Sequence, residues 1–192
     1  MTASELAKKL RLPLGFILAA LYVIFAPRAH TFTWQSLLIG GLVALVGVLI
    51  RGWASGHIMK NDRLATSGPY AHTRNPLYFG SFMISVGFAV AAHWALVFLV
   101  GIFFLVIYAP TMEREKANIR GRFPNDYPRF QNNVPAFFPR LTPWRGGGMP
   151  AEGVGFSMDL YMKHGEWKAA LGYAGAMAYL GLRLWMKSRH GA

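Results

Sequence analysis

Three observations predict an all-α fold, a polytopic bundle of about five transmembrane helices: a hydrophobic composition, long uncharged runs and basic residues gathered on one side. The chain is 54% hydrophobic and 15% charged, whereas ordinary soluble domains are roughly 45–50% apolar and 25% charged. The uncharged run 75–112 has 38 residues and would measure about 57 Å as one helix, nearly twice the ~30 Å hydrocarbon core of a bilayer. We therefore interpret it as two short spans and a tight turn.

Each apolar run is assigned to one helix in chain order. Residues 12–26 follow three basic residues and are similar to a signal peptide, but without a convincing cleavage site we expect a first transmembrane helix. Residues 34–50 form a second span, whose glycines permit close helix contact. Residues 77–92 and 94–110 form the two short spans. Residues 167–187 form a last helix, whose alanines at every fourth position fit packing on the bundle or on a second copy, as in a homodimer.

The composition limits the domain count and the chemistry. The whole chain, 1–192, is interpreted as one membrane domain with a motif-bearing core at 51–140 and a linker at 141–165. The sequence has no cysteine, which excludes disulfides, thiolate zinc sites and cysteine nucleophiles, and we predict no metal site. Basic residues facing anionic lipid headgroups explain the net charge of +12 better than nucleic-acid binding does.

The basic residues also predict the orientation of the chain. With a cytoplasmic amino terminus, sixteen lysines and arginines lie in inside segments and four in outside segments, as the positive-inside rule favours. We expect the inner membrane of a bacterium or an equivalent membrane. The polar segments 51–74 and 114–168 then both face the cytoplasm, where they can meet.

The first polar segment ends in a dense motif at 68–80, Gly-Pro-Tyr-Ala-His-Thr-Arg-Asn-Pro-Leu-Tyr-Phe-Gly. Pro76 suits the first position of a helix, where its missing N–H is not needed. The free N–H groups of that helix start suit a carboxylate or another anion, and Arg74 can add a bidentate contact. The alternative is that Arg74 anchors a helix end among lipid headgroups.

The second polar segment opens with two carboxylates in a chain that has few. Glu113 and Glu115 follow an apolar span directly, where an unpaired carboxylate is costly. Either residue can hold a cationic or hydroxyl-bearing ligand. Either can instead form a salt bridge with a basic neighbour such as Lys116 or Arg120.

Together the two segments resemble the isoprenylcysteine carboxyl methyltransferase and phospholipid methyltransferase superfamily. The resemblance covers Gly68 to Pro139: Gly-Pro-Tyr and Arg-Asn-Pro-x-Tyr-x-Gly, then about 40 residues later Glu, Phe, Tyr and Val-Pro. It implies a small helical membrane enzyme that holds S-adenosylmethionine in a cytoplasmic pocket, between helix ends and the second polar segment. The sequence departs from the family pattern at several positions, among them Lys116 at the second position of the usual Glu-Glu pair and Ala136 where an arginine is usual. These departures leave open whether Glu113 or Glu115 matches the first glutamate of that pair.

The resemblance also implies roles for individual residues. Arg74 would take the carboxylate of S-adenosylmethionine, and Glu115 would accept from its ammonium or ribose hydroxyls. His72 is a candidate general base, or else an interfacial residue, so the predicted catalytic residues are Arg74, Glu115 and His72. The residues assigned to cofactor binding are Tyr70, Arg74, Asn75, Pro76, Tyr78, Glu115 and Tyr127.

The expected function is methyl transfer to a lipophilic acceptor, which is either an isoprenylcysteine-like carboxylate or a lipid headgroup. Two other functions remain open. A sterol-reductase-like enzyme has a similar first block but binds NADPH, and its usual Lys-Tyr-Gly stretch is missing here. A non-catalytic membrane scaffold could keep the fold without the chemistry. Binding of S-adenosylmethionine or of NADPH distinguishes the three.

Overall fold

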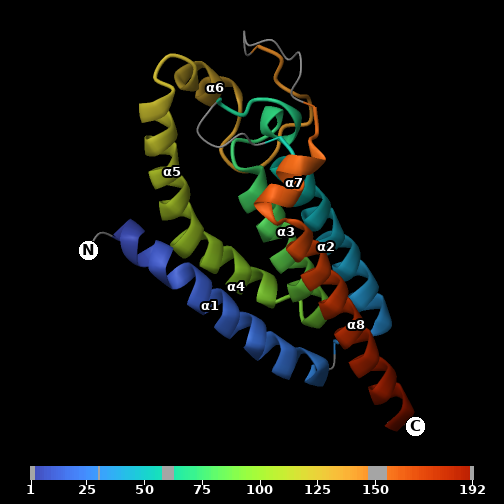
Figure 1. Cartoon of the computed structure of the whole chain (residues 1–192). Helices are drawn as coiled ribbons and strands as arrows, with labels where there is room; N and C mark the ends of the chain where they lie inside the picture. Colours follow the sequence, from blue (N-terminus) through green and yellow to red (C-terminus); the bar gives the residue numbers. More distant parts are fainter. Residues whose placement is uncertain (1–2, 30, 58–62, 147–154, 191–192) are drawn as a thin grey trace.

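A computed structural model describes residues 3–29, 31–57, 63–146 and 155–190. Within these ranges every regular element is helical, which confirms the all-α prediction (Figure 1). The elements in chain order are α1 Ala3–Phe25, η1 Ala26–Arg28, α2 Trp34–Ser55, η2 Gly68–Ala71, α3 Pro76–Ala92, α4 Leu96–Phe103, η3 Phe104–Tyr108, α5 Ala109–Arg122, α6 Tyr127–Asn133, α7 Met158–His164 and α8 Trp167–His190.

Helices α2 and α3 form a tightly packed pair, as the glycines of the second span predicted. A Cβ added to Gly47 would lie 2.5 Å from the Gly80 carbonyl oxygen, and one added to Gly87 would lie 2.4 Å from the Ala44 nitrogen. Such distances mean that the two backbones are in contact, since real Cβ atoms do not approach other atoms so closely. The end of the pair formed by the last turn of α2 and the first turn of α3 carries the candidate site.

The helix of the fourth predicted span does not end at residue 110. Helices α4, η3 and α5 run as one continuous helix, Leu96–Arg122, so Glu113 and Glu115 lie on its continuation. The stretch η3 is a π-helix, whose wider turn changes the hydrogen-bond register just before Pro110 and accommodates a residue without an N–H. The Thr111 hydroxyl donates to the Ile107 carbonyl at 2.9 Å within this stretch.

Two helices of the described residues are long and apolar enough to cross a membrane, Trp34–Ser55 and Leu96–Arg122, where the sequence predicted five spans. The apolar part of α1 and the whole of α3 are shorter, at Pro13–Tyr22 and Pro76–Ala92. The 17 residues of α3 make about 25 Å of helix, less than the thickness of a hydrocarbon core. Helix α8 is long, but basic residues occupy both of its ends.

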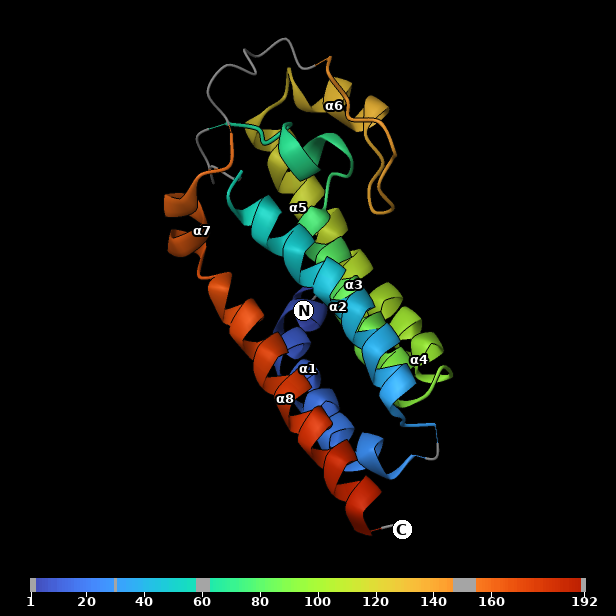
Figure 2. The same ribbon diagram turned by 90° about the vertical axis from the view of Figure 1, so that its right-hand side faces the viewer.

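The first and last helices pack on different helices: α1 lies against η3 and α5, and α8 lies against α2 (Figures 1 and 2). Helix α8 lies along α2, where the Tyr173 hydroxyl donates to the Gly41 carbonyl at 3.0 Å. A buried apolar cluster joins the far ends of these helices, and its members are Phe32, Leu37, Ala91, Leu180 and Leu184. Within the predicted irregular linker lies one short helix, α7, which Ser157 caps at its start and Gly165 ends in a left-handed conformation, φ 69°.

Candidate functional site

The two polar segments meet, as the sequence predicted. Three backbone hydrogen bonds join them. The Arg74 N–H donates to the Pro135 carbonyl at 2.9 Å, the Arg140 N–H donates to the His72 carbonyl at 3.0 Å, and the Trp144 N–H donates to the Ala71 carbonyl at 2.9 Å. These contacts join stretches more than 60 residues apart in the chain. The segment that follows α6 therefore lies directly against the loop that leads into α3.

Side chains of the first segment reinforce this pairing. The Asn75 amide donates to the Ala136 carbonyl at 2.8 Å, and the Thr73 hydroxyl donates to Phe137 at 2.9 Å. The His72 Nδ1 lies 2.8 Å from the Arg140 carbonyl oxygen. A carbonyl only accepts, so Nδ1 carries the proton and Nε2 keeps a lone pair. Thr73 was not singled out in the sequence, although it is buried and joins the two segments.

Arg74 lies between these segments with part of its hydrogen-bonding capacity unused. Its Nη1 donates to the Tyr127 hydroxyl at 3.2 Å, which brings together two predicted cofactor residues. Its Nε is buried and has no hydrogen-bond partner among the described residues. A buried guanidinium N–H without an acceptor is rare in folded proteins and favours an anionic ligand at this position.

The start of α3 lies beside Arg74 and has no side-chain cap. Pro76 occupies the first turn, and the Asn75 side chain does not cap the helix; its amide Nδ2 donates to the Ala136 carbonyl. The N–H groups of a helix start attract anions through the helix dipole. A helix thus begins at Pro76, as the sequence predicted; its role in binding an anion stays a prediction.

The two acidic residues of α5 have different partners. The Tyr78 hydroxyl donates to Glu115 Oε1 at 2.8 Å, whereas Glu113 forms a surface ion pair with Lys116 at 2.9 Å. Glu115 therefore faces the first turn of α3, and Glu113 has the salt-bridge role that the sequence left open. Tyr78 also packs edge-on against Tyr108, with ring centroids 5.4 Å apart.

Tyr70 lies beneath this region and is 6% exposed. Burial raises the pKa of the Tyr70 phenol above its usual range, and the carboxylates of Glu115 and Glu166 raise it further, against an opposing effect of Arg51. The phenol therefore stays neutral under physiological conditions. Glu115 and the Arg51–Glu166 pair therefore both act electrostatically on the Tyr70 hydroxyl.

An apolar wall adjoins the polar contacts. The ring of Phe137 packs edge-on against Phe79 and Phe82, at centroid distances of 5.7 and 5.5 Å, and Phe82 lies 5.1 Å from Phe104 of η3. Phe138 follows Phe137 and is 70% exposed. We call Phe79, Phe82, Phe104, Phe137 and Phe138 the aromatic wall.

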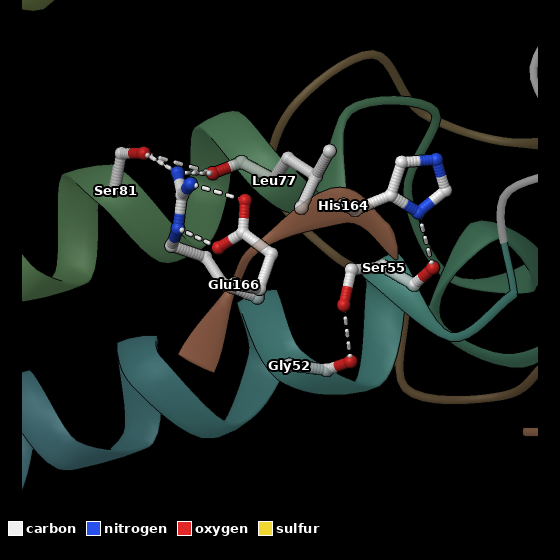
Figure 3. A network of polar contacts seen from close by, with 7 residues as sticks. Gly52, Ser55, Leu77, Ser81, His164 and Glu166 are labelled. Carbon is white, nitrogen blue, oxygen red and sulfur yellow. Dashed lines mark hydrogen bonds and ion pairs between the residues drawn. The ribbon is translucent and has the colours of Figure 1, made fainter. Parts of the chain in front are cut away.

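Sequence reasoning missed the network around Arg51. Arg51 and Glu166 form a bidentate ion pair at 2.7 and 2.9 Å, and the same guanidinium contacts α3 (Figure 3). The signal that could have revealed this network was Glu166, a carboxylate directly before the apolar helix α8 in a chain that has eight acidic residues.

Comparisons with known proteins identify relatives of this chain. Residues 36–125 match the model of a family described as phospholipid methyltransferase. The chain is similar to the cobalt-zinc-cadmium resistance protein CzcN of Cupriavidus metallidurans, at 31% identity over 142 residues, 71% of this chain and 64% of that protein. It is also similar to the nickel-cobalt-cadmium resistance protein NccN of Alcaligenes xylosoxydans xylosoxydans, at 31% identity over 119 residues, 59% of this chain and 55% of that protein. The alignments thus span less than two thirds of either relative, and no solved structure matches.

Proposed function

We propose that this chain, whose residues 36–125 belong to the phospholipid methyltransferase family, transfers a methyl group from S-adenosylmethionine to a lipid-like acceptor. The observation that carries the proposal is the buried Arg74 Nε, which has no partner among the described residues and lies next to an uncapped helix start. A carboxylate placed there would accept from the Arg74 Nε and would also be favoured by the dipole of the helix.

The amino-acid end of S-adenosylmethionine has the charges that the site complements. Arg74 and the first turn of α3 would hold its carboxylate, and Glu115 would accept from its ammonium or its ribose hydroxyls. The Tyr78 hydroxyl, at 2.8 Å from Glu115, orients that carboxylate. The aromatic rings of Tyr78 and Tyr127 supply faces against which a sulfonium or an adenine can pack.

S-adenosylmethionine supplies an electrophilic methyl group, which an acceptor takes in an in-line displacement when the two are held close together. The protein therefore mainly positions the reactants. An acceptor that carries a proton needs a base as well, and His72 Nε2 has the free lone pair to serve as that base, since Nδ1 donates to the Arg140 carbonyl.

The acceptor side is formed by the aromatic wall. The wall is apolar, and Phe138 at its edge is exposed. It is connected to the polar contacts through Phe137, whose carbonyl accepts a hydrogen bond from the Thr73 hydroxyl. Such a surface suits the hydrocarbon part of an isoprenylcysteine-like carboxylate or of a lipid whose headgroup receives the methyl.

The same reasoning supports a membrane-embedded enzyme of about five spans, with its site and amino terminus on the cytoplasmic side of a bacterial inner membrane or an equivalent one. Two helices have the length and composition of spans. Sixteen of the twenty basic residues lie in segments on the proposed cytoplasmic side. The proposed occupants are a lipophilic small molecule or lipid and S-adenosylmethionine.

Calorimetric titration of S-adenosylmethionine into the purified protein in detergent tests the proposal, with NADPH as the control ligand. We expect saturable binding by the natural chain, loss of binding in Arg74→Ala, and unchanged binding in Arg120→Ala, which removes an exposed arginine of α5. Binding of NADPH alone would favour a reductase. Binding of neither ligand by a folded sample would favour a non-catalytic scaffold.

A further inference from the structure

One guanidinium group connects α2, α3 and the residue that precedes α8, beside the candidate site (Figure 3). Arg51 of α2 donates from Nε and Nη2 to the two carboxylate oxygens of Glu166, at 2.9 and 2.7 Å. Its Nη1 donates to the Leu77 carbonyl at 3.3 Å and to the Ser81 hydroxyl. Arg51 therefore links the last turns of α2, the first turns of α3 and the residue just before α8.

The Arg51–Glu166 pair is largely shielded from water, with side chains 23% and 13% exposed. Removing one partner of such a pair leaves the other charge buried and uncompensated. The planar fork of arginine makes the bidentate bonds and the α3 bonds at once, whereas the point charge of a lysine cannot. The orientation of Arg51 toward α3 thus depends on Glu166.

The C-terminal segment holds Glu166 in place through contacts with the end of α2. The Ser157 N–H donates to the Gly56 carbonyl at 2.9 Å, and the His164 Nδ1 donates to the Ser55 carbonyl at 3.0 Å (Figure 3). These bonds satisfy carbonyls at a helix end, which have no partner within the helix. All three residues of the segment lie outside the family-matched residues 36–125.

The contact points of Arg51 on α3 are neighbours of the proposed cofactor residues. Leu77 lies between Pro76 and Tyr78 in the first turn, and Ser81 lies one turn further. Arg51 and Glu166 also act electrostatically on the buried hydroxyl of Tyr70, as Glu115 does. A shift of the first turn of α3 would move the Tyr78 hydroxyl away from Glu115.

We propose that Glu166 is a positioning residue: through Arg51 it fixes the first turn of α3, and the C-terminal segment 156–190 is thereby part of the scaffold of the site. The consequence for S-adenosylmethionine rests on the proposed function. The consequence for the order of α3 does not, so the two can be tested separately.

Hydrogen exchange measured by mass spectrometry, together with calorimetric titration of S-adenosylmethionine, tests the proposal on the full chain in detergent. Glu166→Gln breaks the ion pair, and Arg51→Lys keeps a charge pair but loses the α3 bonds. Ser81→Ala removes one α3 contact and serves if the first variants fail to fold. Tyr173→Phe is the matched control, because it removes the α8 bond to Gly41 and keeps the aromatic ring that lies against Phe88, beyond residues 77–81 of α3.

We expect Glu166→Gln and Arg51→Lys to speed exchange of the amides at 77–81 and to weaken binding of S-adenosylmethionine about tenfold, which is the effect of weakening one hydrogen bond to a charged group. Ser81→Ala should have the same two effects to a smaller extent. Tyr173→Phe should change neither the exchange at 77–81 nor the binding of S-adenosylmethionine. Unchanged exchange at 77–81 in both ion-pair variants, or the same change in Tyr173→Phe, would overturn the positioning role. If the natural chain binds no S-adenosylmethionine, the proposed function fails, and the exchange data still decide the role of Glu166.

Discussion

The hydroxyl of Tyr78 donates a 2.8 Å hydrogen bond to the carboxylate of Glu115, a residue 37 positions later in the chain. This bond joins the first turn of α3 to α5 and directs an exposed carboxylate toward the candidate site. Glu113, on the same helix, instead pairs with Lys116 at the surface. The contact therefore distinguishes two acidic residues that the sequence left equivalent.

Tyr78→Phe should weaken S-adenosylmethionine binding about tenfold, because a hydrogen bond to a charged group contributes roughly 1.5 kcal/mol, and its loss frees the Glu115 carboxylate to move. Calorimetric titration measures the change. Tyr161→Phe, which removes a hydroxyl from α7, should bind as the natural chain does. Equal affinity of Tyr78→Phe and the natural chain would remove Glu115 from the site.

Gly87→Ala should destabilise the protein by about 1–3 kcal/mol, as overpacking of a tight interface does. The added Cβ would lie 2.4 Å from the Ala44 nitrogen and 2.4 Å from the Gly40 carbonyl oxygen, so the α2–α3 pair would have to separate. Thermal unfolding in detergent measures the loss. Gly101→Ala, where no atom lies within 4 Å of the added Cβ, should be neutral or slightly stabilising. Similar midpoints for the two variants would contradict the close packing.

Stability should fall at alkaline pH through Tyr70. Burial raises the pKa of the folded Tyr70 phenol, so above about pH 10, the ordinary tyrosine pKa, the unfolded chain loses a proton that the folded chain keeps. The stabilising contribution is therefore complete below pH 10 and is lost as the pH rises beyond it. Unfolding midpoints between pH 8 and 11 should fall less steeply in Tyr70→Phe than in the natural chain. Parallel curves would show that Tyr70 does not contribute.

His72→Gln separates the structural and chemical roles of His72. A glutamine amide can still donate to the Arg140 carbonyl, but it cannot take up a proton as an imidazole does. We expect S-adenosylmethionine affinity within about twofold of the natural value and methyl transfer to a protonated acceptor reduced about 100-fold, a typical effect of losing a general base. Radiolabelled methyl transfer measures the rate. Full activity in the variant would leave His72 with its loop contact alone.

Local sequence signals predicted most helices and the two polar segments that meet in the structure. The glycines of α2 predicted close contact with a neighbour, and Pro76 predicted the start of α3, because these features depend on a residue's own backbone or size. The end of the fourth span could not be predicted in this way. Pro110 normally ends a helix, and only the π-helical stretch before it lets the helix continue to Arg122.

The sequence by itself determined that the chain is helical and apolar, that two polar motifs bracket a helical hairpin, and that a helix begins at Pro76, two residues after Arg74. The tertiary structure alone decided which distant groups meet: the Arg74 N–H with Pro135, Tyr78 with Glu115, and Arg51 with Glu166. The physical reason is that these bonds form between segments 37 to 115 residues apart, so they depend on how helices pack and not on the residues beside them in the chain.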